Sequence, residues 1–114
     1  MVIHRNDMKV EQKERMRDGE GVLTLTHLTE DNSQKNVRLA GEFILPPGSS
    51  IGKHRHENET EYFIFLEGNG TVDDNGIETP VKKGDMMITG NGASHCVKNT
   101  GSGPLVFNAV IVTH

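Results

Sequence analysis

Three histidines and a glutamate have the residue types and the spacing of a metal site. In a strand, residues i and i+2 point to the same face, so the imidazoles of His54 and His56 can converge on one ion. In a helix the same two-residue step turns by about 200°, and the two rings would diverge. We therefore predict a strand at residues 54–56, with Glu61 and His95 as the third and fourth ligands. Three imidazoles and a carboxylate form a recognisable site for a divalent metal.

Glu61 lies an odd number of residues from His56, so one unbroken strand would place it on the opposite face. The polar run at residues 57–60 predicts a loop that resets the alternation. A strand at residues 61–66 then runs back beside His56, with Glu61 at its start. Phe63 and Phe65 share the Glu61 face, so we expect the carboxylate at the edge of an apolar pocket.

Length and composition predict one compact domain. The chain has 114 residues, of which 33% are hydrophobic. A net charge of −4 without a basic cluster argues against nucleic acid or an anionic membrane as a partner. No apolar run reaches the length of a signal peptide or a membrane span. The single Cys96 rules out an intramolecular disulfide and suits a reducing compartment, so we expect a cytoplasmic protein.

The pattern along the chain predicts an all-β fold. Residues 1–20 are mostly charged, and we interpret them as an N-terminal arm, either loosely attached or paired with a partner subunit. Residues 21–114 form the predicted β domain, with short strands and no convincing amphipathic helix. Asn75-Gly76 predicts a tight hairpin. A small core and exposed edge strands favour a homodimer. Besides the strands near the ligands, strands are expected at residues 22–28, 37–45, 71–73, 77–81, 86–89, 94–98 and 105–112.

Two spaced patterns resemble the two motifs of the cupins. The first reads Gly48-x5-His54-x-His56-x4-Glu61-x6-Gly68, and the second reads Gly84-x5-Gly90-x-Gly92-x2-His95-x3-Asn99. The one departure is Gly90, where the family pattern has proline. The resemblance is to small single-domain cupins, with some likeness to oxalate-handling members. It implies a double-stranded β-helix (jelly roll), one metal ion held in the barrel by three histidines and one glutamate, and frequent dimerisation.

The predicted barrel interior is apolar. Alternation places Arg38 and Arg55 on outward faces, so no arginine is expected in the lumen. Glu57 and Glu59 are interpreted as solvated loop charges, with the alternative that either reaches over the mouth of the site. The side chains expected to line the pocket are Phe43, Phe63, Phe65, Met86, Ile88 and Phe107.

Two further residues carry reactive groups. His27 shares a strand face with Leu23 and Leu25, which favours a core or interface histidine over a proton donor at the pocket edge. Cys96 follows His95 and must point away from it in a strand. We therefore interpret Cys96 as a buried structural thiol rather than a ligand or a nucleophile.

Two functional hypotheses follow from the sequence. The first is a metal-dependent enzyme of the oxygenase, decarboxylase or isomerase class that acts on a small polar ligand such as a carboxylate. The second is a non-catalytic module that binds or senses a small molecule. The ligand set suits Mn, Fe, Co, Ni, Cu or Zn, and four protein ligands leave one or two positions on an octahedral ion. A decarboxylase also needs a proton donor beside the metal, and the sequence offers no clear one.

Overall fold

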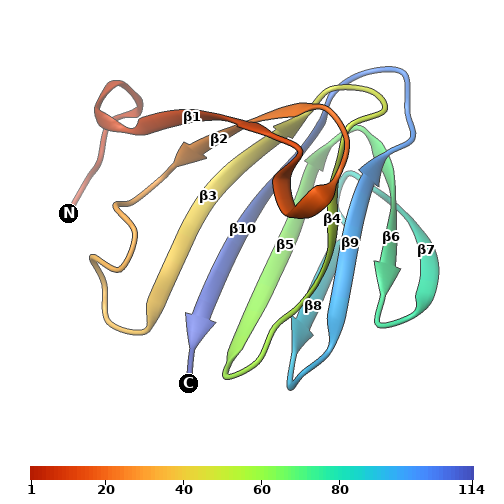
Figure 1. Cartoon of the computed structure of the whole chain (residues 1–114). Coiled ribbons are helices and arrows are strands. Elements are labelled where there is room, and N and C mark those ends of the chain that lie inside the picture. Colours follow the sequence, from red (N-terminus) through yellow and green to blue (C-terminus); the bar gives the residue numbers. More distant parts are fainter.

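The computed structural model describes all 114 residues and contains two antiparallel sheets that face each other (Figure 1). The six-stranded sheet has the order β1 (Lys9–Glu14), β2 (Val22–His27), β3 (Val37–Leu45), β10 (Leu105–Thr113), β5 (Glu59–Glu67) and β8 (Met86–Gly90). The four-stranded sheet has the order β4 (Ser50–Arg55), β9 (Ser94–Asn99), β6 (Asn69–Asp74) and β7 (Ile77–Lys82). Two 3-10 turns, η1 (Arg5–Asp7) and η2 (Met16–Asp18), are the only helical segments. The predicted all-β jelly roll is confirmed.

The core lies between the two sheets and is built around four phenylalanines. Phe107 on the central strand β10 packs against the other three, with ring centroids 5.2 Å from Phe43, 4.5 Å from Phe63 and 5.5 Å from Phe65. All four rings are at most 2% exposed. Alternation along β3, β5 and β10 directs these side chains inward, as the sequence pattern predicts.

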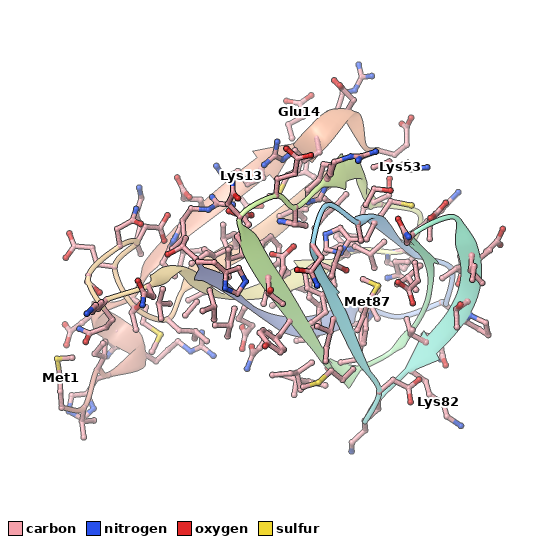
Figure 2. The ribbon with its side chains drawn as sticks, turned by 90° about the horizontal axis from the view of Figure 1, so that it is seen from below. Met1, Lys13, Glu14, Lys53, Lys82 and Met87 are labelled. Atoms are coloured by element: carbon pink, nitrogen blue, oxygen red, sulfur yellow. The ribbon has the colours of Figure 1, made fainter.

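Strand β8 presents the opposite face from the one we expected. Residues paired across an antiparallel ladder share a face, and β5 pairs Phe63 with Met87 and Ile64 with Met86. Met87 is therefore buried, and Figure 2 shows it in the interior of the molecule. Met86 and Ile88 are 53% and 56% exposed, so their assignment to the pocket is wrong. Because residues 86–88 are all apolar, the sequence does not show which of them point inward. Only the pairing with β5 decides this.

The N-terminal segment is part of the same sheet. Strand β1 pairs with β2 along its whole length, from Lys9 opposite His27 to Glu14 opposite Val22. The loop that joins β1 to β2 contains η2 and lies beside β4, as Figure 1 shows. A segment predicted as an arm thus supplies an edge strand and a loop that covers the end of the barrel near the candidate site.

The hairpin between β6 and β7 follows the sequence prediction. Asn75 and Gly76 have φ angles of 47° and 92°, the left-handed pair that a two-residue hairpin with the right twist requires. The Asp73 side chain accepts a hydrogen bond from the Gly76 N–H at 2.7 Å, which closes the turn. Asp73 therefore stabilises the hairpin turn.

Candidate metal centre

Three strands bring the four predicted ligands together. His54 lies in β4 directly opposite His95 of β9, and His56 follows the end of β4. Glu61 lies in β5. The connecting loop is shorter than predicted, because β5 already begins at Glu59, and the reversal is made at Asn58 with a φ of 58°. This left-handed residue resets the alternation as the longer predicted loop was expected to do.

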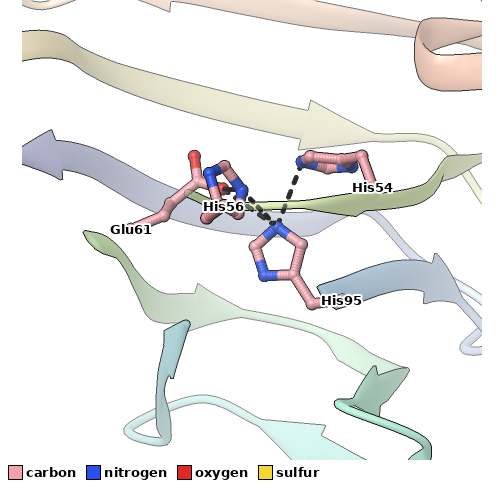
Figure 3. A group of neighbouring side chains, drawn as sticks. All are labelled: His54, His56, Glu61 and His95. Carbon is pink, nitrogen blue, oxygen red and sulfur yellow. Dashed lines mark hydrogen bonds and ion pairs between the residues drawn. The ribbon is translucent and has the colours of Figure 1, made fainter. Parts of the chain in front are cut away.

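The donor atoms of the four residues meet at one point inside the barrel (Figure 3). The Glu61 Oε1 atom lies 2.9 Å from His56 Nε2 and 3.0 Å from His95 Nε2. His95 Nε2 lies 3.0 Å from His56 Nε2 and 3.2 Å from His54 Nε2. All four donors lie within 4.8 Å of one another. Donors about 2.1 Å from an ion and at right angles would be about 3.0 Å apart, so the spacing fits a metal ion.

The outer ring nitrogens fix the direction of the lone pairs. His54 Nδ1 lies 2.8 Å from the Gly52 carbonyl oxygen, and His56 Nδ1 lies 2.6 Å from a Glu59 carboxylate oxygen. Each oxygen accepts a hydrogen bond, so each Nδ1 carries a proton and each Nε2 points inward, where it offers a lone pair to a cation whenever the ring is neutral. His95 Nδ1 is held by the Thr89 hydroxyl at 2.8 Å. Lone pairs that face one another over such short distances suit a bound cation.

Burial and hydrogen bonding tune the charges of the cluster. Burial by itself raises the pKa of the Glu61 carboxyl, but hydrogen bonds from His56 and His95 outweigh it and lower that pKa to about 2. Burial lowers the pKa of His54 and so favours its neutral form. Burial also disfavours charge on His56, but Glu61 and Glu59 outweigh it and raise the His56 pKa. Glu61 is therefore an anionic donor across the physiological range.

Glu59 belongs to the site, which favours the alternative of a charge at its mouth over that of a solvated loop charge. Its side chain is 15% exposed and bridges His56 to Arg38. Arg38 Nε and Nη2 donate to the two Glu59 carboxylate oxygens at 3.0 and 2.9 Å. This bidentate pair orients the carboxylate that in turn orients His56.

Arg38 reaches the site because of an irregularity in β3. The ladder pairs Ile111 with Leu39 and Val112 with Val37, so Arg38 is left without a partner. A bulge of this kind turns a side chain away from strict alternation. Arg38 lines a small cavity beside the candidate metal ligands instead of pointing outward, which corrects the expectation of a lumen without arginine. A bulge depends on the partner strand and leaves no signal in the β3 sequence alone.

A small cavity, named the metal-site cavity, opens beside three of the candidate metal ligands. Its volume is about 60 Å³, and His54, His56 and Glu61 form one side. Phe43 and Phe63 line it as predicted, whereas Phe65 and Phe107 lie deeper in the barrel, where they pack on each other and not on the cavity. The remaining apolar wall consists of Met16, Leu39, Ile51 and Ile111, and two arginines, Arg17 and Arg38, complete the lining.

His27 and Cys96 lie outside the cavity. His27 is 9% exposed and bonded on both ring nitrogens, at 2.6 Å to a Glu11 carboxylate oxygen and at 2.8 Å to one of Asp31. It is a buried structural histidine that joins β1 to the segment after β2, and it does not border the metal-site cavity. Cys96 is a free thiol of intermediate exposure, less buried than we expected.

The family model for the Cupin domain matches residues 41–112. This chain belongs to the cupin family. A curated relative from Thermotoga maritima, named an oxalate-binding protein, is 41% identical over 113 residues, covering 98% of this chain and 93% of that protein. A solved structure from the same organism, described as a predicted oxalate decarboxylase, has a TM-score of 0.94 and 39% identity, with both chains covered completely.

More distant cupins share the fold alone. A putative sugar phosphate isomerase from Acidithiobacillus ferrooxidans has a TM-score of 0.80 at 21% identity, and the match covers 99% of this chain and 75% of that chain. At this identity the likeness supports the architecture and nothing about the substrate. None of the helical segments in this cupin has the length and the apolar character that crossing a membrane requires.

Proposed function

We propose that this cupin binds one divalent transition-metal ion through His54, His56, Glu61 and His95. The observation that carries the proposal is the inward direction of the Nε2 lone pairs of His54 and His56, fixed by their Nδ1 partners. When both rings are neutral, these two lone pairs and the Glu61 carboxylate repel one another, and a cation between them removes that repulsion. The donor set suits Mn, Fe, Co, Ni, Cu or Zn, and the supply of metal in the cell selects among these ions.

We further propose that a small carboxylate such as oxalate occupies the open positions of that ion. The name of the Thermotoga maritima relative, an oxalate-binding protein, supports this choice. The cavity of about 60 Å³ has the volume of about two water molecules, which favours a ligand of few atoms. Two arginines, Arg17 and Arg38, line the cavity and add positive charge that suits a carboxylate, and the apolar wall offers little to the hydroxyls of a sugar.

A second candidate is catalytic turnover of the same carboxylate. Four protein ligands leave room on an octahedral ion for a substrate, which favours this candidate. A divalent ion bound there supplies a Lewis acid that polarises a carboxylate oxygen. The protein's own contribution is to favour the neutral imidazole of His54, to exclude water with an apolar wall, and to place positive charge at the cavity. The simplest reaction of this class converts monoprotonated oxalate into formate and carbon dioxide.

The metal assignment is tested by elemental analysis of a double variant, His54→Ala with His95→Ala. We expect about one divalent ion per wild-type chain and none in the variant, while circular dichroism still shows a folded β protein. The control is His4→Ala, which removes an exposed histidine near the N-terminus, outside the cluster. One metal ion per chain in the double variant would show that the site assignment is wrong.

The choice between binding and turnover needs one titration and one assay. Isothermal titration of oxalate into metal-loaded protein should show saturable binding, and the metal-free protein should show none. Formate, carbon dioxide and O₂ consumption are then measured in the same samples. Binding without any of these changes supports a binding module, and formate production above the metal-free control supports a decarboxylase. The proposal includes a reducing cytosol as the location, in keeping with the free Cys96.

A further inference from the structure

Two arginines line the metal-site cavity: Arg38 is paired with a carboxylate, and Arg17 is not. Arg38 donates two hydrogen bonds to Glu59, so its guanidinium is matched by a carboxylate. Arg17 also lines the cavity, is exposed, and has no carboxylate within 4.0 Å. A free guanidinium presents a planar pair of donors that fits a carboxylate. Arg17 is therefore the cation at this cavity that is available to a ligand.

The backbone around Arg17 is held in an unusual conformation. Arg17 lies in η2 with a φ of 54°, and Arg15 and Asp18 also have positive φ angles of 49° and 63°. Side chains other than glycine seldom adopt this region, and such strain persists where surrounding contacts determine it. The strained backbone lies at the edge of a cavity, which is consistent with a role of this segment in binding.

Two glycines hold the loop against the ligand strand. A Cβ on Gly52 of β4 would lie 1.8 Å from the Arg17 carbonyl oxygen, and a Cβ on Gly19 would lie 2.2 Å from the Ser50 carbonyl oxygen. Glu20 and Ser50 add two hydrogen bonds of 2.9 Å between the loop and β4. The absence of side chains at both glycines is what lets the two backbones meet and places Arg17 beside the cavity.

The same contact connects Arg17 to a metal ligand. The Gly52 carbonyl oxygen accepts the hydrogen bond from His54 Nδ1, while the Gly52 Cα faces the Arg17 carbonyl group. The ladder between β4 and β9 is also irregular between Ile51 and His54, so the strand bends where the loop packs against it. Gly52 therefore fixes the Arg17 backbone relative to a donor of the candidate metal site.

We propose that Arg17 is a specificity residue that binds the second carboxylate of a short dicarboxylate. This inference rests on the proposed function, in which the first carboxylate occupies open positions of the metal ion. The small cavity leaves no room for a long spacer between the two groups. A monocarboxylate fills the metal positions and leaves Arg17 unpaired, so the residue separates the two classes of ligand.

The test compares two probes on two variants. Oxalate and acetate are titrated into Mn(II)-loaded wild-type protein, Arg17→Gln and Arg15→Gln, with binding followed by calorimetry and by the relaxation of solvent protons near Mn(II). Arg15→Gln is the matched control because it removes the same charge from the same loop, also at a positive φ, from a side chain that does not border the cavity. Elemental analysis and the thermal midpoint of each variant establish that metal and fold are retained.

We expect Arg17→Gln to raise the dissociation constant for oxalate about tenfold, as the loss of one charge-assisted hydrogen bond predicts. Its effect on acetate should stay below about threefold, and Arg15→Gln should change neither constant by more than that. Equal oxalate constants for the two variants would overturn the role of Arg17 and leave the proposed function intact. If wild-type protein retains Mn(II) but binds neither probe, the carboxylate function fails, and the specificity role fails with it.

Discussion

Glu59→Gln should weaken metal binding although Glu59 touches no metal. Its carboxylate accepts the His56 Nδ1–H at 2.6 Å and receives two hydrogen bonds from Arg38. The amide keeps an acceptor for His56 but loses the negative charge that makes the imidazole a better donor. Loss of such an outer partner lowers metal affinity by about 10- to 100-fold, or about 1.4 to 2.7 kcal/mol.

The burial of Glu59 supports the upper part of that range. Its side chain is 15% exposed, and the His56 side chain is 1% exposed, so solvent screens their interaction weakly. The Arg38 guanidinium holds the pKa of the Glu59 carboxyl below its usual value, so the wild-type group is an anion at neutral pH. The substitution therefore removes a full charge next to a ligand ring.

The assay is competition for Zn(II) or Co(II) against a chromophoric chelator, with Glu57→Gln as the control. Glu57 is two residues away and exposed, so its variant removes the same charge without a contact to a ligand. We expect the metal affinity of Glu57→Gln to lie within about twofold of the wild-type value. Equal losses in the two variants would show that only overall charge matters, and the orienting role of Glu59 would be refuted.

Three further predictions concern stability and assembly. Glu11 and Asp31 outweigh burial and raise the His27 pKa, so His27→Gln should lower the unfolding midpoint more at about pH 6 than at about pH 9. The stabilisation is present below the unfolded pKa of about 6.5 and is lost as pH rises through the folded value. Asn99→Ala removes three hydrogen bonds of a buried side chain and should cost about 3 kcal/mol in urea unfolding. We expect a homodimer that uses the exposed apolar face of β8, so sedimentation should show Ile88→Lys as a monomer and wild type as a dimer.

The four donor residues could be predicted because their positions depend on local spacing. His54 and His56 share a face in any strand, and the reversal at Asn58 needs only a few polar residues. The placement of Glu61 beside His56 follows from that reversal. The candidate metal ligands are thus largely a property of one short stretch, with His95 brought in by the β4–β9 ladder.

The residues around the ligands could not be predicted because they depend on contacts between distant strands. Arg38 enters the site through a bulge that only the β10 ladder reveals. Thr89 faces His95 because the pairing with β5 determines which side chains of β8 point inward. The apolar run at 86–88 does not reveal this. Arg17 reaches the cavity because backbone from two parts of the chain meets at Gly52. A longer alternating pattern in β8 would have shown which of its side chains point inward. No local signal in the sequence marks Arg38 or Arg17 as a residue of the site.

Charge balance at the cavity connects metal binding to ligand binding. Glu59 and Glu61 contribute two negative charges, and Arg17 and Arg38 contribute two positive charges, so these side chains sum to zero. A divalent ion raises the sum to +2, which a dianion such as oxalate cancels. Burial of an uncompensated charge is costly, so each partner should bind more tightly when the other is present. We expect oxalate to slow the loss of Mn(II) to a chelator several-fold in wild type and less in Arg17→Gln, and equal rates with and without oxalate in wild type would contradict the coupling.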